Sequence, residues 1–303
     1  MNLPSLGEIE ETIQRLKSLD LSKIHYHKLV SILMNETKTL PISSALMKEG
    51  HTIERGRIHS IDEILTCEKD LTYRTDFENI KKFGRANMPG QSLFYGAFRS
   101  SDIEYPRLVN LMELSEVLRN NEGIDSEFRL TVGRWRIKKE FEVAELVFNE
   151  KYLENSDIKS KIDYHENLLM EQFPDKQAEA QALMRFFTDE FAKKEITSHF
   201  DYMISCAYTD LVMHNSERRM AGVAYPSVRA DYKAFNVALA PHIVDSCLEL
   251  EMAAMFRVIT QKDKHNYLIT EAMSKNFGIY NTDFNWVFVD GKDEEDVERE
   301  LMK

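Results

Sequence analysis

The sequence predicts an α+β fold in which two β-rich blocks are separated by helices. Patterns typical of strands fill residues 51–148 and 221–290, and apolar side chains recur at helical spacing before and between these blocks. Strands and helices do not alternate one by one, so a doubly wound parallel sheet is not expected. A chain of 303 residues can bury a core without disulfides or metals.

The first fifty residues are predicted to form an N-terminal helical extension. Ile9, Ile13 and Leu16 recur at helical spacing within residues 7–19, and residues 27–34 carry a second, shorter pattern.

The first β block contains one predicted helix. Short extended runs separated by glycine and proline fill residues 51–95, with residues 92–96 as the clearest strand. Residues 105–120 carry apolar side chains along one face, which predicts an amphipathic helix. Residues 128–148 are rich in Val, Phe and Trp and are predicted to be β structure.

A helical insertion is expected at about residues 150–220. It includes a helix over residues 175–194, for which Asp175 after Pro174 is the expected N-cap, and a second apolar stripe over residues 200–211. Five strands are expected afterwards, at residues 221–225, 235–239, 247–260, 267–270 and 286–289.

These elements give a domain at residues 51–290 that the insertion interrupts. Residues 291–303 form a charged C-terminal tail, expected as a surface helix.

Composition limits the function. The net charge of −12, from 51 acidic and 39 basic residues, argues against a nucleic-acid surface, although about two or three arginines suffice for one anionic small molecule. The three cysteines are far apart and are expected to be free thiols. Neither a signal peptide nor a run of ~18 apolar residues occurs, so we expect a cytoplasmic protein without a membrane span.

Several common enzyme motifs are absent. The sequence has no dinucleotide-binding glycine fingerprint and no P-loop, and residues 90–94 lack the closing glycine of a nucleophile elbow. His25 and His27 have no third ligand nearby, and Leu169 stands where a zinc motif beginning at His165 needs its second histidine. No metal is therefore expected.

One segment with chemical potential is residues 83–95. Gly84, Arg85 and Asn87 precede a Pro-Gly turn and a strand that reaches Tyr95. The arginine, beside backbone N–H groups of the turn, suits a phosphate. An ordinary turn with an incidental arginine is the alternative.

The second segment is residues 222–228, followed by Asn236. Pro226 restricts the backbone at the end of an apolar strand, and Ser227 presents a hydroxyl at the boundary between strand and loop. Alone, this pattern also fits a simple turn.

Together and in this order, the two segments resemble the RES family, named for an arginine, a glutamate and a serine. Members show an early Arg-x-Arg, then Gly-Arg-x-Asn-x-x-Gly before a Leu-Tyr strand, a helix with the glutamate, and later Gly-x-x-Tyr-Pro-Ser with Asn-Val-x-Leu downstream. The matching residues here are Arg55, Arg57, Gly84, Arg85, Asn87, Gly90, Phe94, Tyr95, Gly222, Tyr225, Pro226, Ser227, Asn236, Val237 and Leu239. The resemblance covers about residues 51–120 and 221–240.

The glutamate is matched by Glu113, which follows Asn110 and Leu111 on the predicted helix. Glu116 lies one turn later and is the alternative. The chain is longer than the family domain, so residues 1–50 and about 150–220 are additions. These helices are expected to cover the pocket, mediate self-association into a homo-oligomer or restrain activity.

The resemblance implies an ADP-ribosyltransferase-like β core and NAD as the substrate, cleaved at the nicotinamide–ribose bond. Cleavage builds positive charge on the ribose, which a carboxylate can stabilise. Glu113, Arg57 and Ser227 are the expected catalytic residues, with Ser227 as a hydrogen-bonding group and not a nucleophile. The expected NAD-binding residues are Arg55, Arg85, Asn87, Tyr95, Tyr225 and Asn236.

The acceptor stays open at this point. Inorganic phosphate would make the chain an NAD phosphorylase, with the extra arginine of the Arg55-Gly56-Arg57 element as a second anion site, and water would make it a glycohydrolase. A protein ADP-ribosyltransferase and a catalytically silent RES-like binding module are the alternatives. Family members are often toxins, and an antitoxin here would be a separate protein, since no DNA-binding segment is recognisable.

Overall fold

The computed structural model describes residues 3–98, 106–115, 125–149, 156–215, 219–262, 266–275 and 282–289. Within these residues, ten strands form one sheet in the order β1-β5-β6-β7-β3-β2-β4-β8-β9-β10. β5 and β6 run parallel, and the other neighbouring strands are antiparallel. The predicted α+β class is confirmed, and the fold is not a doubly wound parallel sheet.

The strands are β1 (Ser44–Met47), β2 (Thr52–His59), β3 (Phe94–Phe98), β4 (Ser126–Ile137), β5 (Phe141–Glu145), β6 (Gly222–Pro226), β7 (Phe235–Leu239), β8 (Leu248–Thr260), β9 (Asn266–Lys275) and β10 (Val287–Phe288). The helices are α1 (Leu6–Ser18), α2 (Tyr26–Thr37), α3 (Pro106–Leu114), α5 (Ser156–Gln172), α6 (Gln177–Phe191), α7 (Met203–Asp210) and α8 (Pro241–Cys247). A 3-10 turn, η5 (His199–Tyr202), precedes α7, and a π-helical turn, η6 (Leu211–Asn215), follows it.

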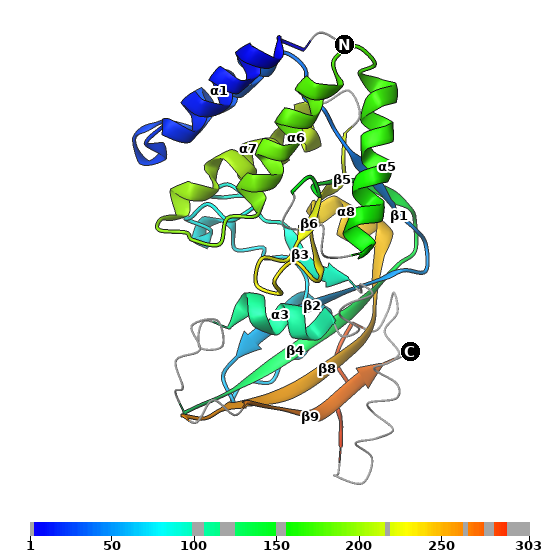
Figure 1. Cartoon of the computed structure of the whole chain (residues 1–303). Coiled ribbons are helices and arrows are strands. Elements are labelled where there is room, and N and C mark those ends of the chain that lie inside the picture. The colour runs from blue at the N-terminus through cyan, green and yellow to red at the C-terminus, as the bar shows by residue number, and fades with distance from the viewer. Residues whose placement is uncertain are drawn as a thin grey trace.

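Most of the helices and the long strands lie at opposite ends of the molecule. Helices α1, α5, α6 and α7 gather beside β5 and β6 at the top of Figure 1, whereas the long strands β4, β8 and β9 extend to the bottom. Helix α3 lies between the two ends, next to β2 and β4 in this view.

The helices at the top share one hydrophobic core with the sheet. A single buried cluster includes Leu16 of α1, Leu29 of α2, Phe187 of α6, Tyr208 of α7 and Val223 of β6. Each of these side chains is at most 2% exposed. The N-terminal helices and the insertion therefore bury their apolar stripes in a core that they share with the sheet.

The sheet has two distinct faces because side chains alternate along each strand. One row of paired residues across four strands consists of Glu54, Ala97, Asn236 and Tyr225. We call their side the α3 face, since the side chain of Asn110 in α3 reaches β2 there. Arg55 and Arg57 alternate with Glu54 and Gly56 along β2, so they project from the opposite face.

The structure differs from the sequence prediction within residues 1–50. Ser44–Met47 is a strand, β1, which pairs with β5 at the edge of the sheet. Its four residues are too few for a period to show, and Leu46 is 47% exposed. The boundary expected at residue 50 therefore falls inside the sheet.

Other predicted elements differ at their ends. Helix α6 begins at Gln177 with Lys176 in the N-cap position, so Asp175 is not the cap. The block predicted at residues 128–148 divides into β4 and β5, and α8, with proline in its first turn, was not predicted. α3 ends at Leu114, whereas residues 116–120 of the predicted helix and the tail at 291–303 lie outside the described residues.

The three cysteines are free, as the sequence predicts. Among the described residues, no helix combines the length and the apolar character that crossing a membrane requires.

A buried carboxylate joins the insertion to the sheet. Glu145 of β5 is 2% exposed, accepts an ion pair from Lys161 of α5, and lies 2.6 Å from Nε2 of His165 on the same helix. Burial alone would raise the pKa of Glu145, but the hydrogen bond with His165 and the charge of Lys161 outweigh it and hold the pKa below its usual value.

We predict that Glu145→Gln lowers the free energy of unfolding at pH 7 by roughly 3 kcal/mol, because it leaves Lys161 without its buried partner. A lowered pKa stabilises the folded state above the unfolded value of 4.5, and that stabilisation disappears as the pH falls through the folded pKa. Denaturant unfolding from pH 7 to pH 3 should thus show the two proteins converging in acid.

Glu127→Gln is the matched control. Glu127 is 45% exposed and pairs with Arg257 at 3.4 Å, so its loss should change the unfolding free energy by less than about 1 kcal/mol. Equal losses for the two variants, or a difference that grows in acid, would contradict the stabilising role of Glu145.

Candidate functional site

Two segments of the chain that are distant in sequence meet at the carboxylate of Glu113. Ser227, just after β6, donates a hydrogen bond from Oγ to Glu113 Oε1 at 2.6 Å. Asn236 of β7 donates from Nδ2 to the same oxygen at 2.9 Å. These partners lie 114 and 123 residues away in sequence, so the fold alone brings them to α3. Glu113 itself is half-buried.

Ser227 is fixed by its own loop. Its side chain is 0% exposed, and Oγ also accepts the backbone N–H of Ala230 at 3.2 Å. The loop contains two consecutive residues with positive φ, Asp231 at 48° and Tyr232 at 64°, a conformation that non-glycine residues rarely adopt. The Ser227 hydroxyl is thus held against Glu113, and its expected role as a hydrogen-bonding group in catalysis stays a prediction.

Tyr225 lies beside Asn236 in the register of β6 and β7 and is 3% exposed. Burial raises the pKa of Tyr225 well above its ordinary value, and the charges of Tyr95 and Glu113 act in the same sense, while that of Arg85 opposes them. Each of these groups therefore lies within electrostatic range of Tyr225. We call Glu113, Ser227, Asn236, Tyr225, Tyr95 and Arg85 the Glu113 cluster.

Tyr95 holds the loop that carries Arg85. Its hydroxyl donates to Asn87 Oδ1 at 2.7 Å and accepts the backbone N–H of Ala86 at 3.2 Å. A Cβ at Gly84 would collide with Asn87 Oδ1, so a larger residue there must displace the Asn87 amide from Tyr95. Tyr95 and Asn87 therefore shape the loop, and burial raises the pKa of Tyr95.

The backbone N–H groups of this loop are occupied by protein partners. Gly84 donates to Asn87 O, Met88 to Gln91 Oε1 and Gly90 to Ile80 O. The expectation that the turn presents N–H groups to a phosphate is wrong at these positions. The expected phosphate contact of Arg85 itself stays a prediction.

Arg85 is held by the helical insertion. It donates to the carbonyl oxygens of Phe191, the last residue of α6, and of Lys193, the latter at 3.3 Å. Its guanidinium carbon lies 5.1 Å from the ring centre of Tyr202. A guanidinium has five N–H donors in a planar fork, so these two bonds do not exhaust it.

Arg55 and Arg57 do not join Glu113. Arg55 donates to the carbonyls of Thr72 at 3.1 Å and Tyr95 at 2.7 Å, and Arg57 pairs with Glu63 at 3.2 Å. Both side chains project from the face of the sheet opposite α3, as alternation along β2 requires. The predicted roles of Arg57 in catalysis and of Arg55 in NAD binding are therefore not supported by the geometry.

Sequence reasoning missed two residues that contact this region. Tyr202 faces Arg85 from the insertion, and Asn110 bonds the backbone of β2 from within α3. A tyrosine beside a helical stripe and an asparagine in an amphipathic helix give no distinct signal in a single sequence. Glu116, the alternative to Glu113, lies outside the described residues.

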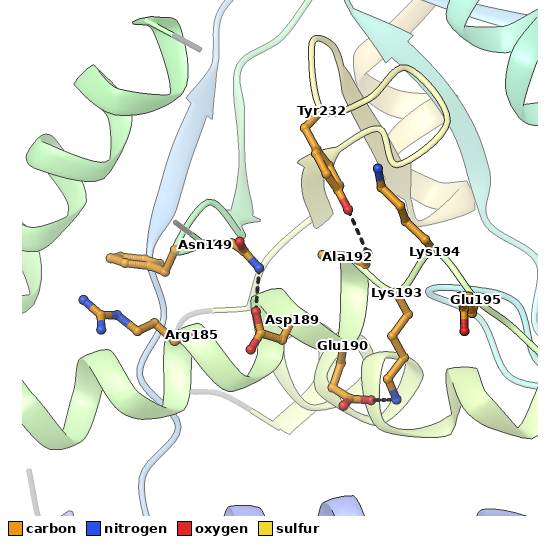
Figure 2. Close-up of a pocket in the computed structure, with 10 residues that line it drawn as sticks. Asn149, Arg185, Asp189, Glu190, Ala192, Lys193, Lys194, Glu195 and Tyr232 are labelled. Carbon is orange, nitrogen blue, oxygen red and sulfur yellow. Dashed lines mark hydrogen bonds and ion pairs between the residues drawn. The ribbon is translucent and has the colours of Figure 1, made fainter. Parts of the chain in front are cut away.

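A separate hollow of about 690 Å³ lies against the loop that follows Ser227 (Figure 2). It is lined by Phe148, Asn149, Arg185, Asp189, Glu190, Ala192, Lys193, Lys194, Glu195 and Tyr232. Tyr232 donates from its hydroxyl to Ala192 O at 3.3 Å, and Lys194 pairs with Asp231 at 2.9 Å. The residues just after α6 therefore hold the loop that follows Ser227. The acidic and basic side chains around the hollow balance, and none belongs to the Glu113 cluster.

Within the part of the chain that the structure describes, no group of three or more His, Cys, Asp or Glu residues is placed to hold a metal ion. Comparisons with known protein families, with curated proteins and with solved structures give no match. The resemblance to the RES family thus rests on the motif residues named above.

We predict that Tyr95→Phe lowers the free energy of unfolding by about 1–3 kcal/mol, because it removes the partner of Asn87 Oδ1 and of the Ala86 N–H in a buried place. Tyr73→Phe is the matched control, since its hydroxyl bonds the carboxylate of Asp245 where solvent can replace it. Denaturant unfolding measures both. A loss for Tyr73→Phe as large as that for Tyr95→Phe would contradict the special role of Tyr95.

Proposed function

We propose that this protein is an NAD-consuming enzyme with an ADP-ribosyltransferase-like core, which cleaves the nicotinamide–ribose bond at Glu113. One observation carries the proposal: Ser227 and Asn236 both donate to Glu113 Oε1, so the second motif segment meets the carboxylate that the resemblance to the RES family selects. Arg85 and Tyr225 lie in the same neighbourhood.

The chemistry suits a fixed carboxylate. The bond between ribose C1′ and the nicotinamide nitrogen breaks, and its electron pair leaves with nicotinamide, which becomes neutral. Positive charge develops on the ribose, and the negative carboxylate of Glu113 stabilises it. An acceptor oxygen then bonds C1′ and releases its proton to solvent.

The hydrogen bonds to Glu113 contribute by orientation. Two donors on one oxygen hold the carboxylate in a single direction, so it need not reorient as the charge develops. Both donors sit on neighbouring positions of the sheet, Ser227 at the end of β6 and Asn236 in β7, and are themselves 0% and 8% exposed. A group held this way is preorganised.

Arg85 is the proposed ligand of the NAD pyrophosphate. Its planar fork matches phosphate oxygens, and the carbonyls of Phe191 and Lys193 fix the direction of that fork. In this arrangement the insertion contributes to substrate binding, because its carbonyl groups fix the orientation of Arg85.

Water is the acceptor that the geometry favours. A phosphate acceptor was expected to use Arg55 and Arg57, but Arg57 pairs with Glu63 and Asp70 and both arginines lie on the far face of the sheet. We therefore propose a glycohydrolase, for which no second anion site is needed.

Release of nicotinamide from NAD by the purified protein tests the proposal. Glu113→Gln keeps the shape of the side chain and removes its charge, so we predict a loss of about 100-fold or more in kcat. Glu116→Gln is the matched control and should retain activity. No release by the wild type would remove the enzymatic function and favour a binding module, and equal loss in Glu116→Gln would remove the assignment of Glu113.

The arginines give a second prediction. Arg85→Lys keeps the charge but loses the planar fork, and we expect KM for NAD to rise about 10-fold to 100-fold. Arg57→Ala should leave the rate unchanged, with and without inorganic phosphate. A rate that rises with phosphate and loses this dependence in Arg57→Ala would overturn the choice of water, and label transfer from NAD to protein would identify a protein acceptor.

A further inference from the structure

Helix α3 packs against β2, and the side chain of Asn110 bonds the backbone of that strand. Among the described residues, the register between β2 and β3 consists of Glu54 and Ala97, and β2 continues to His59 beyond this pair. The side chain of Asn110 reaches this part of β2. Its Oδ1 accepts the backbone N–H of Gly56 at 3.1 Å, and its Nδ2 donates to the backbone oxygen of Glu54 at 3.0 Å.

The Asn110 amide therefore takes the place of a neighbouring strand, offering one acceptor and one donor to the backbone of β2. Its second Nδ2 hydrogen is directed to Pro106 O, 3.2 Å away in the same helix. The side chain is 7% exposed, so water does not compete for these bonds. The position and direction of the amide are both fixed.

Gly56 lets the helix come this close. A Cβ at that position would lie 3.0 Å from Asn110 Cβ and from Leu130 Cδ1, and 3.2 Å from Leu114 Cδ1. These distances are shorter than ordinary van der Waals contacts, so with a larger residue these side chains, Asn110 among them, must give way by a few tenths of an ångström. Gly56, which lies between Arg55 and Arg57 in the sequence, is therefore the residue of this motif that packs against α3.

The start of α3 is held by Glu54. The carboxylate of Glu54 lies 3.4 Å from Arg134 and interacts with the backbone N–H and the charge of Arg107, in the first turn of the helix. A carboxylate at a helix N-terminus is favourable. Burial raises the pKa of Glu54 above its ordinary value, and the two arginines oppose this rise.

Glu113 follows Asn110 by three residues and lies on the same side of the helix, one turn further along. Val109 packs with Ala97, Ala230 and Ala234 in one small apolar cluster, so the same turn of α3 also contacts the loop of Ser227. A shift of α3 on β2 therefore changes the distance between Glu113 and its two donors.

We infer that Asn110 is a positioning residue, which sets the place of Glu113 by joining α3 to the backbone of β2. The inference rests on the proposed function, since it concerns the same carboxylate. Asn110 touches neither substrate nor reacting atoms in this scheme. It acts through Glu113.

Asn110→Asp tests the inference, because the shape is kept while the amide donor that faces Glu54 O and Pro106 O is replaced by a carboxylate oxygen. We expect kcat for NAD cleavage to fall about 100-fold, as for a misplacement of about 1 Å, with KM changed less than about threefold. Ile9→Ala, which removes buried volume from α1 far from α3, should keep kcat. Gly56→Ala crowds Asn110 without altering a polar group and should lower kcat in the same direction.

Hydrogen exchange of the Gly56 amide and of residues 106–114 supplies a readout besides activity. Faster exchange in Asn110→Asp than in Ile9→Ala would support the joint between α3 and β2. If the wild type releases no nicotinamide, the proposed function fails and the exchange experiment still decides the role of Asn110 in docking α3. Wild-type kcat in Asn110→Asp, or equal exchange in the two variants, would overturn the inference.

Discussion

The site depends on how closely α3 approaches the sheet. Gly56 provides the space, Asn110 bonds the backbone of β2, and Glu54 lies against the first turn of the helix. Only with the helix at this depth does Glu113 reach Ser227 and Asn236. Because α3 packs closely on β2, this packing determines the position of the Glu113 carboxylate.

A second constraint comes from the insertion. Its α6 ends at Phe191, where the last carbonyl groups of a helix carry partial negative charge. Arg85 binds there, and Tyr202 covers one side of the guanidinium. The loop after Ser227 is clamped to the same end of α6 through Tyr232 and Lys194. The end of α6 and the residues just after it therefore contact both motif segments, through Arg85 and through the loop after Ser227.

The sequence was informative about elements with a strong period and about motif residues that stay close in space. The helices α1 and α6 and the strands β6 to β8 follow from their apolar patterns, whereas β1, four residues long at the sheet edge, has no pattern to read. Glu113, Ser227 and Asn236 were predicted, and the structure brings them together. Their assigned roles in NAD cleavage stay predictions.

The arginines show where sequence reasoning ends. Arg85 and Arg57 look alike in a motif, but the face from which a strand residue projects depends on register, which is a property of the folded sheet. Arg57 projects away from α3, and the residue of that motif that matters to α3 is Gly56. Asn110 contacts Gly56, 54 residues away, and Tyr202 contacts Arg85, which is also distant in the sequence. A single sequence does not reveal such contacts.

The hydrogen bonds from Arg85 to the end of α6 have a consequence for shortened forms of this chain. A shortened chain that kept only the motif segments would lose the carbonyls that orient Arg85 and would expose the buried apolar side chains of β6 and β7. Removal of these helices would therefore take away apolar packing of the sheet and the orientation of Arg85 together.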